Sequence, residues 1–285
     1  MKRSLSFQDT KPLLYLVATP IGNLKEFSPR AIETLQKSDI IACEDTRNTA
    51  KLLSFFKIEK KLISLREHNE VSVSLEVVKL LKSGIKVAYV SDAGFPAISD
   101  PGEILVQKCL ENDINVSVVG GSNALLVALV ASGLSTEHFY FHGFLKAKKS
   151  EREKELIKLK EKEETLIFYE SPHRIIETLK SMLNLFGNRK AVIARELTKV
   201  HEEYIRANLS ELISADKDSL KGEMVIVVDG NSSMIPEISD KEILEEYKKT
   251  SSELTTKDRI DLVVNKLNVK KNLVYNLVVK NEKEL

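Results

Sequence analysis

Short apolar runs alternate with stretches of helical spacing along the first 120 residues of the chain. Apolar positions recur at helical spacing near residues 29–36, 71–81 and 103–110. The apolar runs that predict strands lie around them, at Leu13 to Ala18, Ile40 to Cys43, Leu62 to Leu65, Lys86 to Val90 and Asn115 to Val119. This alternation predicts a βαβ succession, and therefore one α/β domain with a mainly parallel sheet over residues 1–120.

The pattern changes after Gly120-Gly121-Ser122, where an apolar helix is expected over residues 123–132. Strand-like segments then follow more closely, at 139–142, 166–169, 191–195, 201–207 and 224–228. Close spacing is typical of a mixed or antiparallel sheet, so we expect a second α/β domain over residues 121–230. The stretch 148–164 is almost all Lys and Glu and is interpreted as a solvated outer helix.

Residues 231–285 form a third region, which begins with a polar, linker-like segment up to Pro236. Two apolar stripes follow, at residues 260–267 and 273–278, and a turn separates them. We expect a small module that resembles a helix-turn-helix pair. Between Lys257 and Lys280 there are six basic and two acidic residues, which favours an RNA-docking surface over simple packing.

Composition narrows the class of protein. With 285 residues, 42% hydrophobic and 30% charged, the chain can build two ordinary cores, which excludes a disordered or fibrous protein. The formal net charge of +1 means that any nucleic-acid surface must be a local patch. Cys43 and Cys109 lack the spacing of a metal site or a disulfide framework, and no segment predicts a signal peptide or membrane span. We therefore expect a cytoplasmic protein without a metal.

Two loops in the first domain carry candidate chemistry, because ligands of open α/β sheets lie beyond the carboxyl ends of the strands. Residues 18–24 permit a tight turn, but they lack the GxGxxG pattern of dinucleotide sites. Residues 91–102 contain two Asp, two Pro and two Gly, and predict a rigid loop. Asp92 could pair with an ammonium group or a ribose, whereas simple helix capping could account for Asp100.

Two further loops follow later strands. Residues 120–124 form a small-residue turn at a helix start, which leaves room for a flat, adenosine-like ligand. Residues 168–174 bring an aromatic ring, a carboxylate and two basic groups together. Each of these loops also has an ordinary structural explanation, as a turn or a helix cap.

These loops, in this order, resemble the tetrapyrrole methylase superfamily of S-adenosylmethionine (SAM)-dependent enzymes, and within it the branch that methylates ribosomal RNA. The resemblance covers about residues 12–230 and the helical tail. Its blocks are residues 16–24, 44–47, 67–70, 91–94, 99–102, 168–174, 194–199 and 221–225. Relatives that act on tetrapyrroles usually carry a GxGxGD-type first loop, and Thr19-Pro20-Ile21-Gly22-Asn23 stands here instead. One departure is Gly120-Gly121-Ser122-Asn123, where relatives commonly have a Pro-Gly-small-Ser turn.

The resemblance implies two α/β domains with SAM between them, in a homodimer that methylates the 2′-oxygen of a cytidine in the decoding region of 16S rRNA. The substrate would be the rRNA or the small ribosomal subunit. Two other interpretations stay open. One is a SAM-dependent enzyme that acts on a tetrapyrrole or another small molecule, and the other is an RNA-binding factor without catalysis.

The candidate site residues fall into three groups. Those expected to bind SAM lie mostly after strands or at a helix start: Thr19, Ile21, Ser91, Asp92, Gly94, Asn123, Ala124, Tyr169, Ala194, Gly222 and Met224. A ribose hydroxyl is a poor nucleophile, so a general base is useful, and the candidates are Asp45, Glu170 and Glu196. RNA contact is expected from a rim of Arg47, Arg66, His68, His173, Arg174, Arg195 and Lys199, and from Lys270, Lys271 and Tyr275 in the tail.

Overall fold

The first α/β domain is built on five parallel strands in the spatial order β3-β2-β4-β1-β5. They are β1 (Leu13–Val17), β2 (Ile40–Cys43), β3 (Lys61–Ser64), β4 (Val87–Val90) and β5 (Asn115–Val119). The computed structural model describes residues 11–216, 220–231, 239–251, 254–267, 269 and 271–281. Each strand matches its sequence prediction to within one residue at either end. β2 and β4 are buried along their whole length, as their continuous apolar sequences require.

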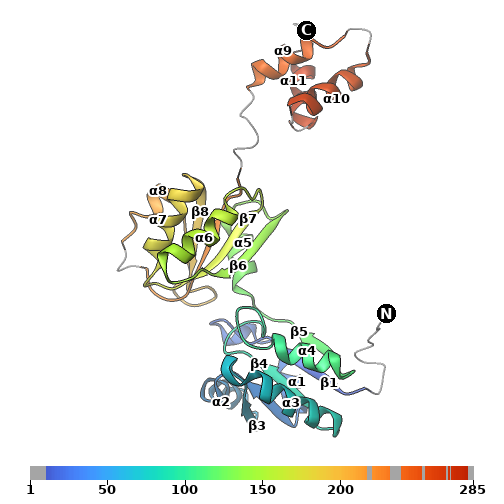
Figure 1. Cartoon of the computed structure of the whole chain (residues 1–285), viewed down its shortest axis with the longest axis vertical. Helices are drawn as coiled ribbons and strands as arrows, with labels where there is room; N and C mark the ends of the chain where they lie inside the picture. The colour runs from blue at the N-terminus through green and yellow to red at the C-terminus, as the bar shows by residue number, and fades with distance from the viewer. Residues whose placement is uncertain are drawn as a thin grey trace. The chain divides into compact units, whose positions relative to one another are not determined.

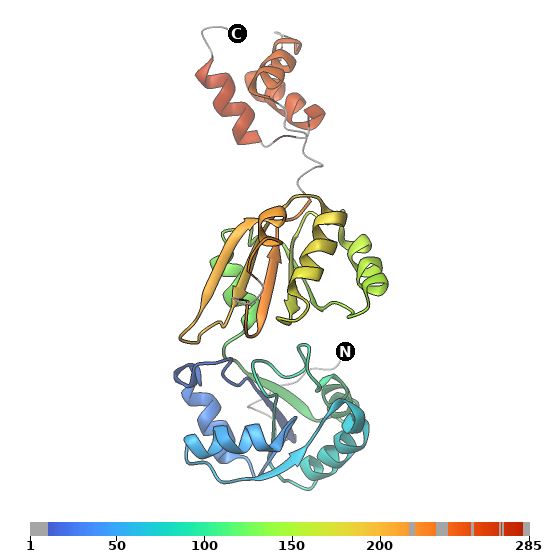
Figure 2. The same cartoon turned by 90° about the vertical axis from the view of Figure 1, so that its left-hand side faces the viewer.

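Helices cover both faces of this sheet (Figure 2). On one face, α3 (Glu70–Lys82) and α4 (Glu103–Glu111) bury Val77 and Leu105 against the strands. On the other, α1 (Pro29–Lys37) and α2 (Thr46–Phe55) bury Leu35 and Leu53. Sequence periodicity missed α2 because Thr49 and Leu53 are its only buried residues, and one of them is polar. Short 3₁₀ turns lie at Leu24–Glu26 and Glu67–Asn69.

The second domain contains a mixed sheet, as its closely spaced strands predicted. Its order is β6-β7-β10-β8-β9, with β6 and β7 parallel and the other pairs antiparallel. The strands are β6 (Phe139–Phe144), β7 (Thr165–Glu170), β8 (Lys190–Arg195), β9 (Glu203–Asn208) and β10 (Met224–Val228). The helices α6 (Lys149–Leu159), α7 (Ile175–Phe186) and α8 (Leu209–Leu212) pack on one face, and α5 (Ala124–Ser132) packs on the other (Figure 1).

The Lys- and Glu-rich stretch forms α6, but the helix is less solvated than expected. It ends at Leu159, and it buries Arg152 together with Leu156 and Leu159. The Arg152 guanidinium donates to the Ala147 carbonyl at 3.2 Å, which explains how a charged residue can be buried there.

The two cysteines, Cys43 and Cys109, are buried in the cores of the first domain, as expected.

The chain divides into two compact units, residues 1–230, which contain both sheets, and residues 231–285, which contain the described helices of the tail. The tail contains α10 (Thr256–Leu267) and α11 (Lys271–Lys280), which correspond to the expected pair. A third helix, α9 (Asp240–Lys248), was not predicted, because only Ile243 and Tyr247 bury its apolar face. These two residues complete the small core that α10 and α11 form.

A buried carboxylate links two helices of the first domain. Gly102 stands at the N-cap of α4, where a Cβ would lie 2.8 Å from Cε1 of Tyr89, so no side chain fits there. Instead Oε1 of Glu70 accepts hydrogen bonds from the N–H of Gly102 at 2.8 Å and of Ile104 at 2.9 Å. Hydrogen bonds to a charged group contribute about 1.5–3 kcal/mol each. Glu70 therefore fixes the end of the loop that follows β4.

Candidate functional site

A cleft of about 600 Å³ opens where the strand ends of the two sheets face each other. Its first wall consists of residues that follow β1, β2, β4 and β5. Its second wall consists of the ends of β6 and β7, the segment after β8 and the start of β10. Because β10 runs antiparallel to β7 and β8, its beginning lies at the same edge as their ends. The volume is typical of a small-molecule site, and its place matches the ligand crevice of open α/β sheets.

The loops after β1 and β4 are hydrogen-bonded to each other. Thr19 and Gly94 exchange both backbone hydrogen bonds, at 2.9 and 3.0 Å, and the Thr19 hydroxyl donates to the Ser91 carbonyl. Close packing also joins the loop after β5, because a Cβ on Gly121 would lie 3.1 Å from the Cβ of Ala18. These contacts give the cleft a rigid floor of backbone.

Carboxylates dominate the charge of the cleft. Lys199 is the one cation among the described residues that line it. The acidic side chains that line it are Glu44, Asp92, Asp100, Glu170, Glu196 and Glu223. Such a lining attracts a cationic ligand and repels phosphate.

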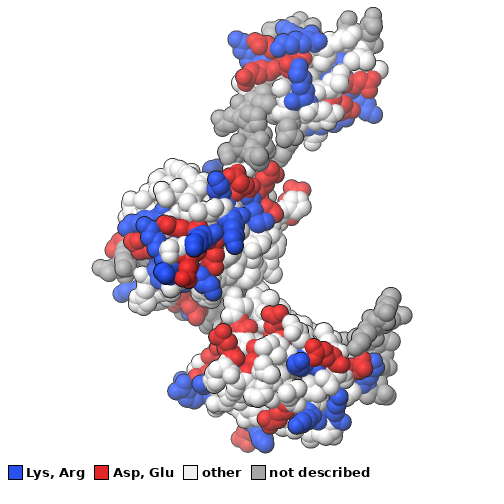
Figure 3. Space-filling view, viewed as in Figure 1, with Lys and Arg blue, Asp and Glu red and all other residues white. Residues whose placement is uncertain are grey.

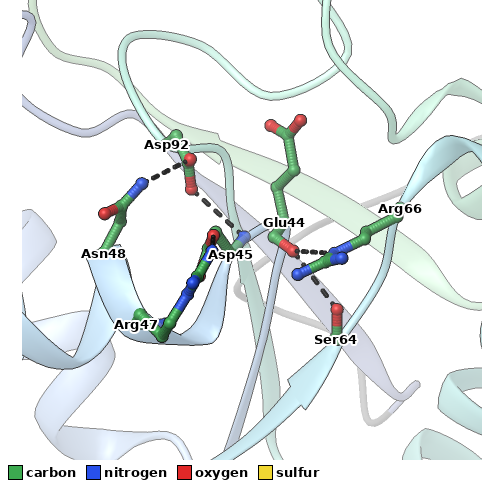
Figure 4. Close-up of polar contacts among 7 residues, drawn as sticks. All are labelled: Glu44, Asp45, Arg47, Asn48, Ser64, Arg66 and Asp92. Carbon is green, nitrogen blue, oxygen red and sulfur yellow. Dashed lines mark hydrogen bonds and ion pairs between the residues drawn. The ribbon is translucent and has the colours of Figure 1, made fainter.

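Asp92, one of these acidic residues, is hydrogen-bonded to residues at the start of α2 (Figure 4). Its two oxygens accept hydrogen bonds from the N–H of Asp45 at 3.2 Å and from Nδ2 of Asn48 at 2.8 Å. Asp45 itself lies outside the cleft lining and caps α2. The guanidinium and N–H of Arg47 bind the Asp45 carboxylate and hold its pKa well below its usual range, which leaves it a weak base.

Asp100 is a partly buried carboxyl group in the lining of the cleft. Its pKa is raised to about 7, mainly by partial burial and then by the nearby Glu44 carboxylate, with smaller contributions from Asp92 and Glu223, while a hydrogen bond with Ser91 opposes the shift. Helix capping does not account for Asp100, because Gly102 is the N-cap of α4 and Glu70 accepts hydrogen bonds from the N–H groups at its start. Burial also raises the pKa of Glu44, with Asp92 as the next largest cause.

The loop that holds Asp100 is strained. Ala97 and Ser99 adopt left-handed backbone angles, with φ of 66° and 64°. Left-handed conformations of non-glycine residues persist only where surrounding contacts enforce them. Here the Ala97 N–H donates to the Pro101 carbonyl at 3.1 Å, and the Tyr89 hydroxyl donates to the same carbonyl at 2.8 Å.

Glu170 lines the cleft, but other groups bind its carboxylate. It forms an ion pair with Arg174 at 2.7 Å and accepts hydrogen bonds from the Thr178 hydroxyl at 2.6 Å and the Ser171 N–H at 2.8 Å. The side chain is almost completely buried. These contacts tie the end of β7 to the start of α7 and leave little capacity for a substrate proton.

Glu196 forms the rim of the cleft together with Lys199 and Gly222. Lys199 Nζ lies 3.0 Å from Glu196 Oε1 and 3.7 Å from Glu223 Oε2. Gly222 has φ of 82°, and a Cβ there would lie only 2.0 Å from Glu196 Oε1. Glycine is therefore required at 222 for the Glu196 carboxylate to occupy its place.

Most residues expected to bind SAM line the cleft. Those that do are Ile21, Asp92, Gly94, Asn123, Ala124, Tyr169, Gly222 and Met224. Thr19, Ser91 and Ala194 are buried behind the surface and support the loops instead. Asn123, at the departure from the family pattern, caps α5 by accepting from the Leu126 N–H at 3.3 Å.

Sequence reasoning missed several lining residues. Phe95, Ile98 and Ser99 belong to the 91–102 loop that the sequence had already indicated, and Glu44 belongs to the matching block 44–47. Phe144 had no signal of its own, because an aromatic residue at a strand end is more often part of a core. The described residues contain no group of three or more His, Cys, Asp or Glu that could hold a metal ion.

The expected RNA rim is scattered and largely compensated by internal contacts. Arg47, Arg174 and Arg195 form ion pairs with Asp45, Glu170 and Glu203, and Arg66 donates to the Glu44 carbonyl. His68 and His173 are exposed, and Lys199 alone lines the cleft. Basic and acidic side chains are intermixed over the face that carries α6 (Figure 3).

In the tail, the residues expected to contact RNA have different surroundings. Lys271 forms an ion pair with Asp261, and Tyr275 is 54% exposed on α11. Lys270 lies outside the described residues. Within the described ranges, no helix combines the length and apolar character that a membrane crossing needs.

Solved structures share this two-sheet fold at low sequence identity. A uroporphyrin-III-C-methyltransferase from Thermus thermophilus is 17% identical, with a TM-score of 0.53 over 79% of this chain and 97% of that one. Diphthine synthase is 12% identical, with a TM-score of 0.59 over 76% of this chain and 89% of that one. At such identities the likeness establishes the fold alone.

Sequence relatives are much closer. Ribosomal RNA small subunit methyltransferase I of Bacillus subtilis (strain 168) is 43% identical over 96% of this chain and 97% of its own length. The protein of the same name from Vibrio cholerae is 43% identical over 93% of both chains. The family model of tetrapyrrole (corrin/porphyrin) methylases matches residues 13–213. The chain therefore belongs to the tetrapyrrole (corrin/porphyrin) methylase family, in its group of ribosomal RNA small subunit methyltransferases I, and is a methyltransferase.

Proposed function

We propose that this methyltransferase transfers a methyl group from SAM to the 2′-oxygen of a cytidine in the decoding region of 16S rRNA. The observation that carries the proposal is an acidic cleft at the ligand position of a methylase fold, in a chain whose close relatives are named for small-subunit rRNA. A cytoplasmic location is part of the proposal, because an enzyme that methylates rRNA must reach it there. No metal is part of the proposal.

The cleft suits SAM in both charge and shape. SAM carries a positive sulfonium and a positive ammonium group, and carboxylates such as Asp92 and Glu44 complement them. Gly94, with φ of 77°, and Ala124 leave room for a flat adenosine, as small residues at a helix start allow. The bound donor supplies a methyl group that is activated by the adjacent positive sulfur.

Asp100 is proposed as the group that accepts the proton of the ribose hydroxyl. The oxygen–carbon bond forms as the carbon–sulfur bond breaks, so the hydroxyl proton must leave, and a carboxylate with a pKa of about 7 can take it at neutral pH. Glu170, Glu196 and Asp45 each bind basic side chains of the protein. The walls of the cleft provide alignment, which can lower the barrier further.

A homodimer is part of the proposal. The helix α5 is apolar on all sides, and its outer face exposes Leu126 at 46% and Val130 at 77%. A helix that is hydrophobic all round is normally buried. A second copy of the chain that packs on α5 would bury this face.

The tail is proposed to dock RNA through α11. The charge argument from the sequence weakens once α9 is included, because residues 231–285 contain ten basic and ten acidic residues, and Glu246 of α9 pairs with Lys266. What remains is the exposed face of α11, which carries Asn272, Tyr275 and Asn276. Amide and phenol groups of this kind can hydrogen-bond and stack with unpaired bases.

A strain that lacks the gene tests the reaction itself. Its 16S rRNA should lose one 2′-O-methylcytidine from the decoding region, as measured by mass spectrometry of nuclease fragments, and the wild-type gene should restore it. Unchanged rRNA would contradict the proposal. A missing tetrapyrrole methylation product, with intact rRNA, would favour the small-molecule alternative.

Substitution of Asp92 tests the SAM site. Asp92→Ala should weaken SAM binding about tenfold or more in calorimetry, because a charged hydrogen-bonding partner is lost. The contacts with Asp45 and Asn48 are also lost, so thermal unfolding must show that the fold persists. Glu59→Ala, on an exposed carboxylate outside the cleft, should leave the affinity unchanged. Equal affinities of the two variants would remove Asp92 from the site.

The pH dependence of methyl transfer tests Asp100. Its carboxylate acts only when deprotonated, so the single-turnover rate should fall as the pH drops below about 7. The positive charge of bound SAM lowers a nearby carboxyl pKa, which places the midpoint at or below that value. Asp100→Asn should abolish this fall of the rate at low pH and slow the reaction about 100-fold or more, while the SAM affinity is retained. A variant that keeps the wild-type pH profile would exclude Asp100 as the base.

Truncation tests the tail. A chain without residues 236–285 should keep its SAM affinity, because the cleft lies entirely within residues 1–230. Its affinity for the rRNA or the small subunit should drop markedly in a filter-binding assay, and Tyr275→Ala in the full chain should reproduce part of the loss. A truncated protein that methylates at the wild-type rate would reduce the tail to a structural appendage.

A further inference from the structure

A β-bulge changes the direction of the last residue of β6. Phe141 pairs with Ile167 and Phe144 pairs with Tyr169, but the register shifts between Phe141 and Gly143. Gly143 has φ of 81°, a conformation that glycine adopts readily. Bulges of this kind insert one extra residue, bend the strand and re-aim side chains near active sites.

Without the bulge, Phe144 would share a face with His142, two residues earlier. The His142 ring lies 5.5 Å from the ring of Phe168, which is buried in the core beneath α7. The Phe144 ring lies instead 5.4 Å from Tyr169, on the opposite face of the sheet. The bulge therefore turns Phe144 away from that core and toward the cleft.

Three rings form an aromatic platform, which we define as Phe141, Tyr169 and Phe144. Tyr169 meets Phe141 edge-on at 4.9 Å and Phe144 at 5.4 Å, both in the T-shaped geometry that aromatic pairs prefer. Phe144 is the outermost ring, with 53% of its surface exposed, and it lines the cleft. Ile98 lines the same cleft from the first domain and is 42% exposed.

Exposure alone would not distinguish Phe144, because single exposed apolar residues are common. Phe139, on the same strand, is 42% exposed and does not line the cleft. Phe144 differs because a bulge directs it into a ligand-sized space and because a second ring supports it from behind. Its free face is available to a flat partner.

We propose that Phe144 is a stacking site for the base of the nucleotide that is methylated, a role that rests on the proposed rRNA substrate. The carboxylates of the cleft repel phosphates, so the phosphate groups of the RNA must stay outside while the ribose and base of one nucleotide enter. Enzymes that act on single nucleotides extrude them and stack the base on aromatic side chains. The adenine of SAM is the other flat ring, and its expected place is deeper, beside Gly94 and Ala124.

Kinetics with 16S rRNA test this role through Phe144→Ala. Loss of one base–aromatic stack should raise the KM for the rRNA about 5- to 100-fold, with the SAM dissociation constant unchanged. Phe144→Trp keeps a ring and should restore the KM, whereas Phe144→Leu, which keeps only apolar bulk, should not. Phe139→Ala is the matched control and should behave as wild type.

Three outcomes would overturn the assignment. In the first, Phe144→Ala has the same KM for rRNA as the control Phe139→Ala. In the second, Phe144→Leu restores the KM as well as Phe144→Trp does. In the third, Phe144→Ala weakens SAM binding instead, which would assign the platform to the adenine of SAM. Failure of the proposed reaction is distinguished by mass spectrometry, which shows whether the wild-type enzyme methylates the 2′-oxygen of the cytidine in 16S rRNA at all. A short RNA with pyrrolocytidine at the target gives a binding signal without methyl transfer, and its emission should be quenched in the wild-type complex and recover in the Phe144→Ala complex.

Discussion

Parallel alignment of β1, β2 and β4 is the constraint on which the site depends. Because these strands run the same way, the segments that follow them meet at one edge, although Thr19, Glu44 and Asp92 are far apart in the sequence. The paired backbone groups of Thr19 and Gly94 then hold two of the loops together. A rigid edge of this kind can position ligand groups without a large entropic cost on binding.

Concentration of carboxylates at this edge has an electrostatic cost. Burial is the main reason that the pKa values of Glu44 and Asp100 are raised, and the neighbouring carboxylates add to both shifts by like-charge repulsion. A cationic ligand relieves this repulsion, so the cleft is complementary to a positively charged methyl donor rather than to RNA phosphates. Basic side chains compensate some of the other acids, since Arg174 pairs with Glu170 and Lys199 pairs with Glu196 and Glu223.

Backbone irregularities recur around the cleft. Ala97 and Ser99 are left-handed in the loop after β4, Glu196 and Thr198 are left-handed after β8, and Gly143 forms the bulge in β6. Each irregularity re-aims a segment that a regular strand or turn would direct elsewhere. These irregular positions lie beside or within the cleft lining, in the same segments as Asp100, Glu196 and Phe144.

The strands of both sheets, the mixed second sheet, the family resemblance and most of the loops that line the cleft could be predicted from the sequence, because hydrophobic period and loop motifs are local signals. Tertiary structure decided what local signals do not encode. The local sequence is compatible with Asp100 as a helix cap, but Glu70, 30 residues away, binds the α4 amides, and burial beside Glu44 raises the pKa of Asp100. Likewise, the direction of Phe144 depends on the register between β6 and β7, which only pairing of distant strands fixes.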